Sequence, residues 1–379
     1  MLNRRMFGSA LMALAVFTAA PSRADATSHA ASDHTAGTIV VTDVLDRKVE
    51  VPASAKRILL GFYFEDFYAV GGPDAYDQVV AISRDAWEKW RNLQWKAYTA
   101  CDSRLEGLID VGEIDAGTFS VEAAIAARPD VAILADWQYS ALGDVVDRLA
   151  AAHIPVVVID YNAQTVAKHV ASTLLLGQLL GQQDRARALA DEYAAAVADV
   201  RARVARADAP ASKVYLELGN RGPDEFGNTY TGHMWGAMID LVGGRNIADG
   251  QVGKWAPLSA EYVLARNPDV IFVAGSGWLG RDRAVVMGPG IDPALTHARL
   301  APYLGRPGWQ DLRAVRQGQV HALYHGGART LYDYAYLQYM GKVLFPTAFA
   351  DVDPQATLER FFATYLPIRA EGSYMTRLP

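Results

Sequence analysis

Side chains suited to recognising a flat or anionic ligand recur in this chain directly after apolar runs with the composition of strands. They are Tyr63, Glu65, Trp137, Tyr139, Tyr161, Arg221, Tyr230, His233, Trp235, Trp278, Arg281, Tyr324, His325 and Arg329. Tryptophan and tyrosine offer rigid apolar area with a polar edge, and the arginine fork matches carboxylate and catecholate oxygens. Imidazole and phenolate can also bind iron. The set therefore favours a large, partly flat ligand that is anionic or carries a metal.

The position of these residues along the chain is more informative than their types. Taken singly, each aromatic is more often a core residue than a ligand contact. Trp137 follows the apolar run 131–135, Trp278 follows the run 270–273, and His325 follows the run 320–324. In a parallel sheet the carboxyl ends of the strands line the ligand crevice, and loops there commonly carry binding residues. We therefore expect the set to face one cleft.

No signature of catalysis accompanies this set. The run 275–280 has the glycine spacing of a dinucleotide-binding loop, but the charged run 281–283 and the Gly-Pro-Gly at 288–290 break the helix that this fingerprint requires. The nucleophile elbow, the His-Glu-x-x-His zinc pattern and the Gly-Lys-Ser/Thr phosphate pattern are absent. We expect no catalytic residue and no cofactor belonging to the protein itself.

The histidines also do not cluster with carboxylates as they would around a bare metal ion. Direct coordination of a metal by His233, His325 or Tyr324 stays open, so the metal ligands are unknown. The single cysteine, Cys101, excludes an intrachain disulfide and a cysteine-based metal site.

The elements that must position these residues occur in duplicate. Residues 120–134 and 259–273 repeat one pattern, in which a serine N-cap precedes a glutamate, a short helix, a Pro-Asp turn and an apolar strand. Two equivalent lobes follow from this repeat, and two lobes imply a cleft between them.

Strands alternating with helices of about ten residues predict an α/β fold with parallel sheets covered on both faces. The proline-free, alanine-rich stretch from about 164 to 207 predicts a long helix that joins the lobes, with Gly177 and Gly181 as positions where it can bend or break. The expected boundaries are 38–162 for the N-terminal lobe, 163–209 for the linker helix region and 210–379 for the C-terminal lobe. Residues 83–110 are expected to form a partly helical insertion on the cleft side.

The start of the chain indicates export. Arg4 and Arg5 precede an apolar run and small-residue cleavage sites, which predicts a cleaved signal peptide over 1–24, of either the twin-arginine or the general secretory type. A disordered leader of small and polar residues is expected over 25–37. Beyond the signal peptide no apolar run of 18 residues occurs, and the net charge of −6 argues against nucleic acid as a partner. We expect a monomer in the periplasm.

Residues 43–52 (DVLDRKVEVP), residues 240–246 (DLVGGRN) and the two repeat copies resemble the helical-backbone (class III) substrate-binding proteins of ABC importers. This class carries ferric siderophores, haem, cobalamin and some free metal ions. The resemblance covers roughly residues 38–345. It implies two Rossmann-like lobes joined by one long backbone helix, with the ligand held in a cleft between them.

The resemblance also implies partners. In this class one glutamate on each lobe docks onto arginines of the permease dimer, and the matching residues here are Glu122 and Glu261. Carboxylates near a helix start are stabilised by the helix dipole and are available to a cationic partner. The function expected is capture of a ferric-siderophore-like Fe(III) chelate for an inner-membrane ABC importer. Haem or cobalamin binding is the alternative within the class, and a metal chaperone or an α/β enzyme on this scaffold is the alternative from another class.

Overall fold

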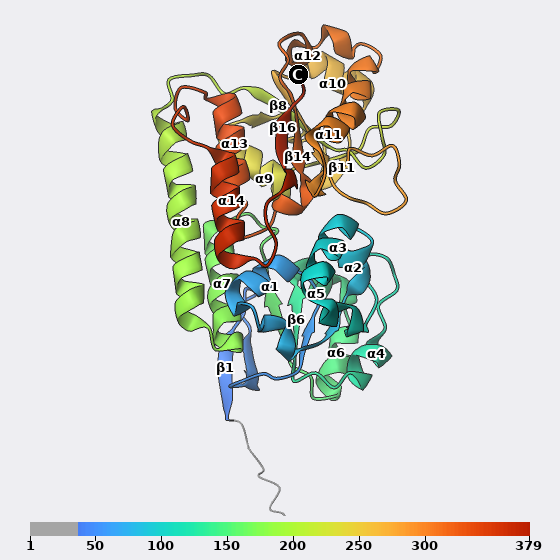
Figure 1. Ribbon diagram of the computed structural model, residues 1–379, viewed down its shortest axis with the longest axis vertical. Helices are drawn as coiled ribbons and strands as arrows, with labels where there is room; N and C mark the ends of the chain where they lie inside the picture. The colour runs from blue at the N-terminus through green and yellow to red at the C-terminus, as the bar shows by residue number, and fades with distance from the viewer. Residues whose placement is uncertain (1–36) are drawn as a thin grey trace, which may run out of the picture. The chain divides into compact units, whose positions relative to one another are not determined.

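The computed structural model describes residues 37–379, and within them two separate five-stranded sheets form the centres of two lobes (Figure 1). The signal peptide predicted over 1–24 and nearly all of the leader predicted over 25–37 lie outside the described residues. Strands and helices alternate in both lobes, so the predicted α/β fold class is confirmed. None of the helices described combines the length and apolar character that crossing a bilayer requires.

The first lobe is built on five parallel strands in the order β5-β4-β3-β6-β7. Alternate residues of β6 enter different cores: Ile133 joins the core that includes α1, whereas Leu134 joins the core under α4 and α6. Both faces are therefore covered, which explains the unbroken apolar runs of this sheet. The strands are β3 (Ile58–Leu60), β4 (Val79–Ile82), β5 (Ile109–Asp110), β6 (Val131–Ala135) and β7 (Val156–Ile159). The helices are α1 (Phe64–Gly71), α4 (Val121–Ala126), α5 (Asp136–Leu142) and α6 (Val145–Ala151).

Two additions extend this lobe. An antiparallel hairpin of β1 (Thr38–Thr42) and β2 (Lys48–Pro52) precedes the sheet. The segment predicted as a partly helical insertion folds into α2 (Arg84–Glu88) and α3 (Asn92–Cys101), which lie between β4 and β5. Both short helices lie on the side of the lobe that faces the second lobe (Figure 1).

The second lobe has the strand order β10-β8-β12-β14-β16, with the first four strands parallel and β16 antiparallel at the edge. Two short antiparallel pairs, β9 with β11 and β13 with β15, lie outside this sheet. The strands are β8 (Lys213–Leu218), β9 (Asn228–Tyr230), β10 (Arg245–Asn246), β11 (Trp255–Pro257), β12 (Val270–Gly275), β13 (Gly288–Pro289), β14 (Val320–Tyr324), β15 (Gly372–Ser373) and β16 (Met375–Arg377). The helices are α9 (Met234–Leu241), α10 (Ala260–Arg266), α11 (Pro293–Leu300), α12 (Arg313–Arg316), α13 (Tyr334–Leu344) and α14 (Pro354–Tyr365).

The region between the lobes consists of two helices that pack side by side, α7 (Val166–Leu180) and α8 (Gln183–Arg206) (Figure 1). Gly181 ends α7 in the left-handed conformation, with φ of 68°. Gly177 allows the close approach of the two helices, because a Cβ there would lie 2.3 Å from the Cβ of Ala186. The long backbone helix is therefore α8, whose 24 residues span about 36 Å and contact both α1 and α13.

Candidate functional site

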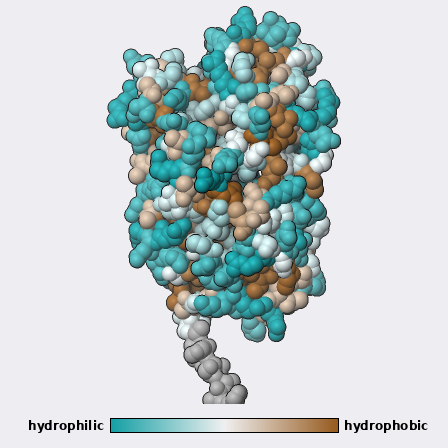
Figure 2. Space-filling model, in the orientation of Figure 1, coloured by the Kyte–Doolittle hydropathy of each residue, from teal (hydrophilic) through white to brown (hydrophobic). Residues whose placement is uncertain are grey.

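A cleft of about 950 Å³ is lined by residues of both lobes. Seven of the fourteen residues that the sequence nominates are in its lining: Trp137, Tyr230, His233, Trp278, Arg281, His325 and Arg329. Trp137 follows β6, Trp278 follows β12 and His325 follows β14, so the carboxyl ends of these strands open onto the cleft. Figure 2 shows hydrophobic patches scattered over this face, one of them near its middle, among largely hydrophilic residues.

Six other nominated residues do not line the cleft, because tertiary packing turns their side chains into the lobes. Glu65 is only 2% exposed and accepts hydrogen bonds from Tyr98 and Tyr332. Tyr139 instead contacts Arg47, whose guanidinium lies 4.1 Å from the ring centre and donates to its hydroxyl at 2.7 Å. The remaining four are buried in the protein interior and are not part of the cleft lining: Tyr63, Tyr161, Trp235 and Tyr324.

These buried residues support the ones that line the cleft. Tyr63 donates to the amide oxygen of Asn162 at 3.0 Å, and Asn162 lines the cleft. Tyr324 packs under the loop that carries His325, because a Cβ on Gly326 would lie 2.4 Å from its Cζ. Tyr161 bonds Thr173 of α7 at 3.0 Å. Their contribution is to position neighbouring residues.

Several lining residues were not nominated from the sequence, because they do not follow a strand of either central sheet. Trp90 and Lys89 come from the turn between α2 and α3, and Trp255 with Lys254 comes from the edge of β11. The placement of 83–110 as a cleft-side insertion was the signal that pointed to Trp90. Other added lining side chains do follow strands of the central sheets and were still missing from the nominated set: Phe62, Asp115, Asp136, Asp160, Asn162, Asn220 and Leu279.

Arg329 is an arginine in the cleft lining without an acidic partner among residues 37–379. Its backbone is left-handed, with φ of 61°, and its guanidinium lies 5.1 Å from the ring centre of Phe62. Nη1 approaches only the sulfur of Met234, at 3.5 Å, and Nε is buried with no hydrogen-bond partner. Burial, together with the nearby charge of Arg91, lowers the pKa of Arg329 to about 9.

Arg91 reinforces this positive field. Its guanidinium lies 4.8 Å from the same Phe62 ring, and its Nη2 is also buried without a hydrogen-bond partner. Neither guanidinium forms an ion pair in the described residues, although the buried carboxyls of Glu65 and Asp66 act on Arg91 and the carboxyl of Asp115 acts on Arg329 at longer range. Arg329 lines the cleft, and a guanidinium N–H group that faces it can donate to an anionic oxygen.

The two histidines of the cleft are held in opposite tautomers by their neighbours. The Trp235 indole N–H, which can only donate, lies 3.0 Å from Nδ1 of His325, so Nδ1 accepts and the proton of the neutral ring is on Nε2. Burial and the charge of Arg329 lower the pKa of His325 well below its usual value, which keeps this ring neutral. His233 Nδ1 lies 2.9 Å from the carbonyl oxygen of Thr231, so Nδ1 donates, and in the neutral form of this ring Nε2 carries the lone pair.

These tautomers decide what each ring can do. Through Nε2, His325 can donate a hydrogen bond to an anionic ligand oxygen. His233 can accept a hydrogen bond or ligate a metal, and a ligating histidine commonly donates its other ring N–H to a carbonyl in this way. In residues 37–379 there is no group of three His, Cys, Asp or Glu side chains that could hold a metal ion.

The cleft walls carry opposite charges. The second lobe contributes Lys254, Arg281 and Arg329, whereas the first lobe contributes the three carboxylates Asp115, Asp136 and Asp160, together with Lys89. Desolvation raises the pKa of Asp160, although the backbone N–H groups of Asn162 and Ala163 donate to this carboxylate at 2.8 and 3.1 Å. A ligand in the cleft therefore meets donors mainly on one side and acceptors mainly on the other.

Direct backbone contacts cross between the lobes at one side of the cleft. The N–H of Asn92 donates to the carbonyl of Gly277 at 3.2 Å, and the N–H of Leu279 donates to the carbonyl of Lys89 at 3.2 Å. The hydroxyl of Ser276 reaches the carbonyl of Trp90 at 3.4 Å. These contacts, which we call the clasp, join the α2–α3 segment to the loop after β12.

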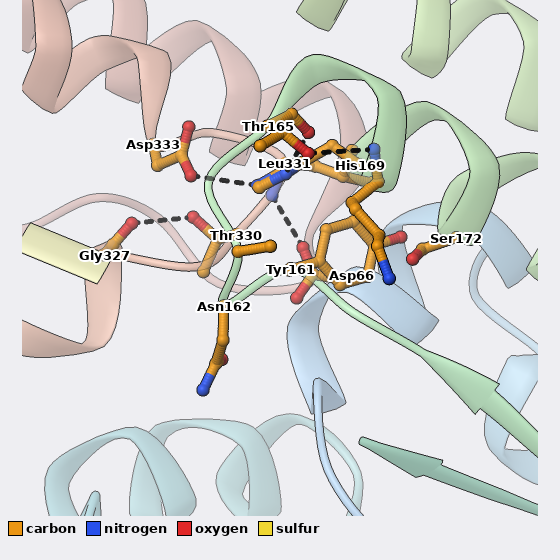
Figure 3. A network of polar contacts seen from close by, with 12 residues as sticks. Asp66, Tyr161, Asn162, Thr165, His169, Ser172, Gly327, Thr330, Leu331 and Asp333 are labelled. Carbon is orange, nitrogen blue, oxygen red and sulfur yellow. Dashed lines mark hydrogen bonds and ion pairs between the residues drawn. The ribbon is translucent and has the colours of Figure 1, made fainter. Parts of the chain in front are cut away.

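A buried polar network joins the lobes behind the cleft (Figure 3). Asp66 at the start of α1 accepts a hydrogen bond from the backbone N–H of Leu331 at 2.7 Å. His169 on α7 contacts Asp333 through Nε2 at 3.1 Å and the carbonyl of Thr165 through Nδ1 at 3.2 Å, with both His169 and Asp333 fully buried. The first lobe, the backbone helices and the segment that carries Arg329 are thus held at one point.

The two glutamates predicted to dock onto a permease occupy equivalent places in the repeat. Glu122 is in the first turn of α4, where Ser120 caps the helix through the N–H of Ala123 at 3.1 Å. Glu261 is in the first turn of α10, where Ser259 caps the helix through the N–H of Tyr262 at 3.2 Å. Both glutamates are exposed. Glu122 forms a surface ion pair with Arg148 at 2.7 Å, which lowers the pKa of its carboxyl.

Comparison with solved structures gives a likeness over nearly the whole chain. The TroA-like periplasmic binding protein FepB from Veillonella parvula is 32% identical and superposes with a TM-score of 0.84, over 90% of this chain and all of that one. A periplasmic heme binding protein from Pseudomonas aeruginosa is 19% identical with a TM-score of 0.55, over 77% of this chain and 94% of that one, a likeness that shows the fold alone.

Comparison with curated proteins gives a shorter match. The vitamin B12-binding protein of Yersinia pestis (strain Pestoides F) is 32% identical over 160 residues, which are 41% of this chain and 53% of that protein. The chain thus spans about half the length of this relative. The model of the family described as "Periplasmic binding protein" matches residues 58–324, a range that includes β3 of the first sheet and β14 of the second. These matches and the two-lobed fold with its helical backbone agree, and the chain belongs to the periplasmic binding protein family, in the helical-backbone class.

Proposed function

We propose that this protein captures an anionic, ferric-siderophore-like Fe(III) chelate in the periplasm and delivers it to an ABC permease in the inner membrane. The observation that carries the proposal is the unpaired guanidinium of Arg329 at the cleft floor, beside a second unpaired arginine, Arg91. Catecholate and carboxylate oxygens match the arginine fork. The aromatic residues of the cleft supply flat apolar area for the rest of the chelate.

In this proposal the protein performs no chemistry, and its function is binding and presentation. The lobes are residues 38–162 and 210–379, with 163–209 between them, and the protein acts as a monomer exported by its signal peptide. Turnover of a candidate ligand would instead favour an α/β enzyme, and tight binding of an uncomplexed metal ion would favour a metal chaperone.

Titration with a ferric catecholate chelate tests the proposal directly. We expect binding at a ratio of one to one with quenching of tryptophan fluorescence, because Trp137 and Trp278 line the cleft. The Trp278→Phe variant should lose part of the quenching, whereas Trp309→Phe, a change in the buried core of the second lobe, should keep it. Unchanged emission of the natural protein at saturating chelate would contradict the proposal.

A corrinoid is the second candidate, and the curated relative named as a vitamin B12-binding protein favours it. The same tryptophans can pack on a flat macrocycle, and His233 offers an open Nε2 to its metal. Titration with cyanocobalamin and with haem, followed by their visible absorption bands, separates these ligands from the ferric catecholate. Tighter binding of either macrocycle than of the ferric catecholate would replace the first candidate.

Docking to the permease is proposed to use Glu122 and Glu261. Because Arg148 already pairs with Glu122, a permease arginine has to displace a surface ion pair worth about 0–1 kcal/mol. We expect the double variant Glu122→Arg/Glu261→Arg to abolish uptake into cells while chelate affinity measured by fluorescence stays unchanged. Glu359→Arg, a charge reversal on exposed α14, is the matched control and should leave uptake intact. Lost affinity in the double variant would contradict this assignment.

A further inference from the structure

A second, smaller pocket of about 250 Å³ opens beside the cleft in the second lobe. It lies between the loop after β8 and the loop after β12, and it shares Asn220 and Arg281 with the cleft lining. Resting on the proposed function, we propose that this side pocket binds a carboxylate-bearing arm of the ligand that also carries a hydroxyl or amino group. The nominated residue Arg221 lies here, outside the main cleft.

The loop after β8, which forms one wall of the side pocket, is held in place by the buried side chain of Arg306. Arg306, only 5% exposed, makes a bidentate ion pair with buried Glu217 at 2.6 and 2.8 Å. The same guanidinium donates to the carbonyls of Pro223, Gly222 and Glu225 at 2.6, 3.3 and 2.7 Å. Hydrogen bonds from one buried guanidinium to three carbonyls of the same loop hold its backbone in place. The loop is thus preorganised before a ligand arrives.

The second wall is pressed against the first. Gly222 has φ of 82°, and a Cβ at that position would lie 3.0 Å from the Cβ of Arg283 and 3.1 Å from its carbonyl oxygen. This close approach brings the loop that carries Arg281 and Arg283 onto the loop that carries Arg221. Three guanidinium groups and two carboxylates, those of Glu225 and Asp282, therefore line one small pocket, so the arginines are in excess by one charge.

Two of these arginines have weak partners, and one has none. Arg221 lies 3.9 Å from Glu225, and Arg283 pairs with exposed Asp224. Arg281 forms no ion pair with any residue of 37–379. Exposed ion pairs contribute about 0–1 kcal/mol, so a ligand carboxylate can compete with them. The pocket can therefore accept an anionic group without breaking a stable internal contact.

The side chain of Asn220 is the reason to expect a hydroxyl or amino group on the ligand arm. Its side-chain oxygen is buried and has no hydrogen-bond partner. A buried acceptor left unpaired costs free energy, which a donor on the ligand would recover. A group that combines a carboxylate with an O–H or N–H donor satisfies Asn220 and the arginines together.

Calorimetric titration with citrate and with tricarballylate tests the side pocket, because the two probes differ only in the hydroxyl of citrate. We expect citrate to bind the natural protein, and tricarballylate to bind at least tenfold more weakly. Arg221→Ala should weaken citrate at least tenfold, and Asn220→Ala should abolish the difference between the probes. Arg187→Ala, on the exposed surface of α8, is the matched control and should change neither value. Thermal unfolding confirms that each variant is folded.

The outcomes separate the side pocket from the proposed function. No binding of citrate, or unchanged binding in Arg221→Ala, overturns the side pocket. Citrate binding that is lost in Arg329→Gln and kept in Arg221→Ala places the probe in the cleft, which overturns the side pocket and leaves the proposed function standing. Citrate binding that depends on Arg221, in a protein that binds no ferric catecholate, supports the side pocket and contradicts the iron chelate.

Discussion

Arg329 is proposed to bind the ligand at some expense in folding stability. Its guanidinium lies 5.1 Å from the ring centre of Phe62, and its Nε is buried without a partner. In this proposal an anionic ligand supplies the missing partner. Binding sites commonly hold residues of this kind, which lower folding stability and raise affinity.

We expect Arg329→Met to raise the free energy of urea unfolding of the apo protein by roughly 1–2 kcal/mol, because it removes an uncompensated charge and keeps apolar contact with Phe62. The same change should weaken ferric catecholate binding at least tenfold. Arg187→Met, at an exposed position of α8, is the control and should change neither the free energy of unfolding nor the affinity. A variant with lower stability and unchanged affinity would show that Arg329 is structural.

Helices α7 and α8 form the stiff connection between the lobes, and a single glycine sets how closely they pack. Gly177 faces Ala186, and any Cβ at Gly177 would lie 2.3 Å from the methyl group of this alanine. The backbone carbonyl of Gln182 lies 3.1 Å from the same point, so the neighbouring backbone also restricts the space. The two helices therefore cannot pack in this way around a larger residue.

Gly177→Val should lower the free energy of unfolding by about 2–3 kcal/mol, the usual cost of overpacking a close helix contact. Gly107→Val, at a position where a Cβ meets nothing within 4 Å, is the matched control and should cost much less. Urea unfolding followed by circular dichroism measures both variants. Equal effects in the two variants would show that the α7–α8 contact tolerates expansion.

Several contacts join the lobes of the whole molecule, among them the backbone helices, the clasp and the buried network of Asp66, Leu331, His169 and Asp333. The hydroxyl of Tyr332 also donates across to Glu65. Desolvation raises the pKa of buried Asp66 well above its usual value, and desolvation also raises the pKa of Glu65. Contacts at separate places limit how far one lobe can move against the other.

The stability of this junction should depend on pH. Because the pKa of Asp66 is higher in the folded than in the unfolded protein, its favourable contribution is complete below the unfolded value near 3.9 and is lost as the pH rises through the folded value. Asp66→Asn keeps an oxygen acceptor for the N–H of Leu331 and cannot ionise.

We therefore expect Asp66→Asn to raise the free energy of unfolding at pH 7 by on the order of 1 kcal/mol and to have less effect at pH 5. Urea unfolding at the two pH values gives this difference. Asp191→Asn on exposed α8 should show no such pH dependence. A loss of stability in Asp66→Asn at pH 7 would mean that the ionised carboxylate is required at the junction.

The repeat by itself predicted both lobes and the strand ends that carry Trp137 and Trp278, and the apolar run 320–324 predicted the strand end before His325. A strand and its following loop are encoded within a few neighbouring residues. Local pattern gave Gly177 and Gly181 as two candidate positions for a bend or break, and the structure has the break at Gly181, which adopts a left-handed conformation that other residues rarely take. The family resemblance rests on the same local motifs. These are properties of adjacent residues, so one sequence suffices to detect them.

Only the tertiary structure decided which side chains of those loops reach the cleft. Phe62 lines it whereas its neighbour Tyr63, with φ of 57°, turns toward Asn162 and Tyr161. Trp90 and Trp255 reach the cleft from segments outside the two central sheets. Arg329 lacks an ion-pair partner because none of the segments that fold around it places a carboxylate within ion-pairing distance in the described residues. Burial and pairing are set by contacts between residues far apart in the chain, and no local pattern records them.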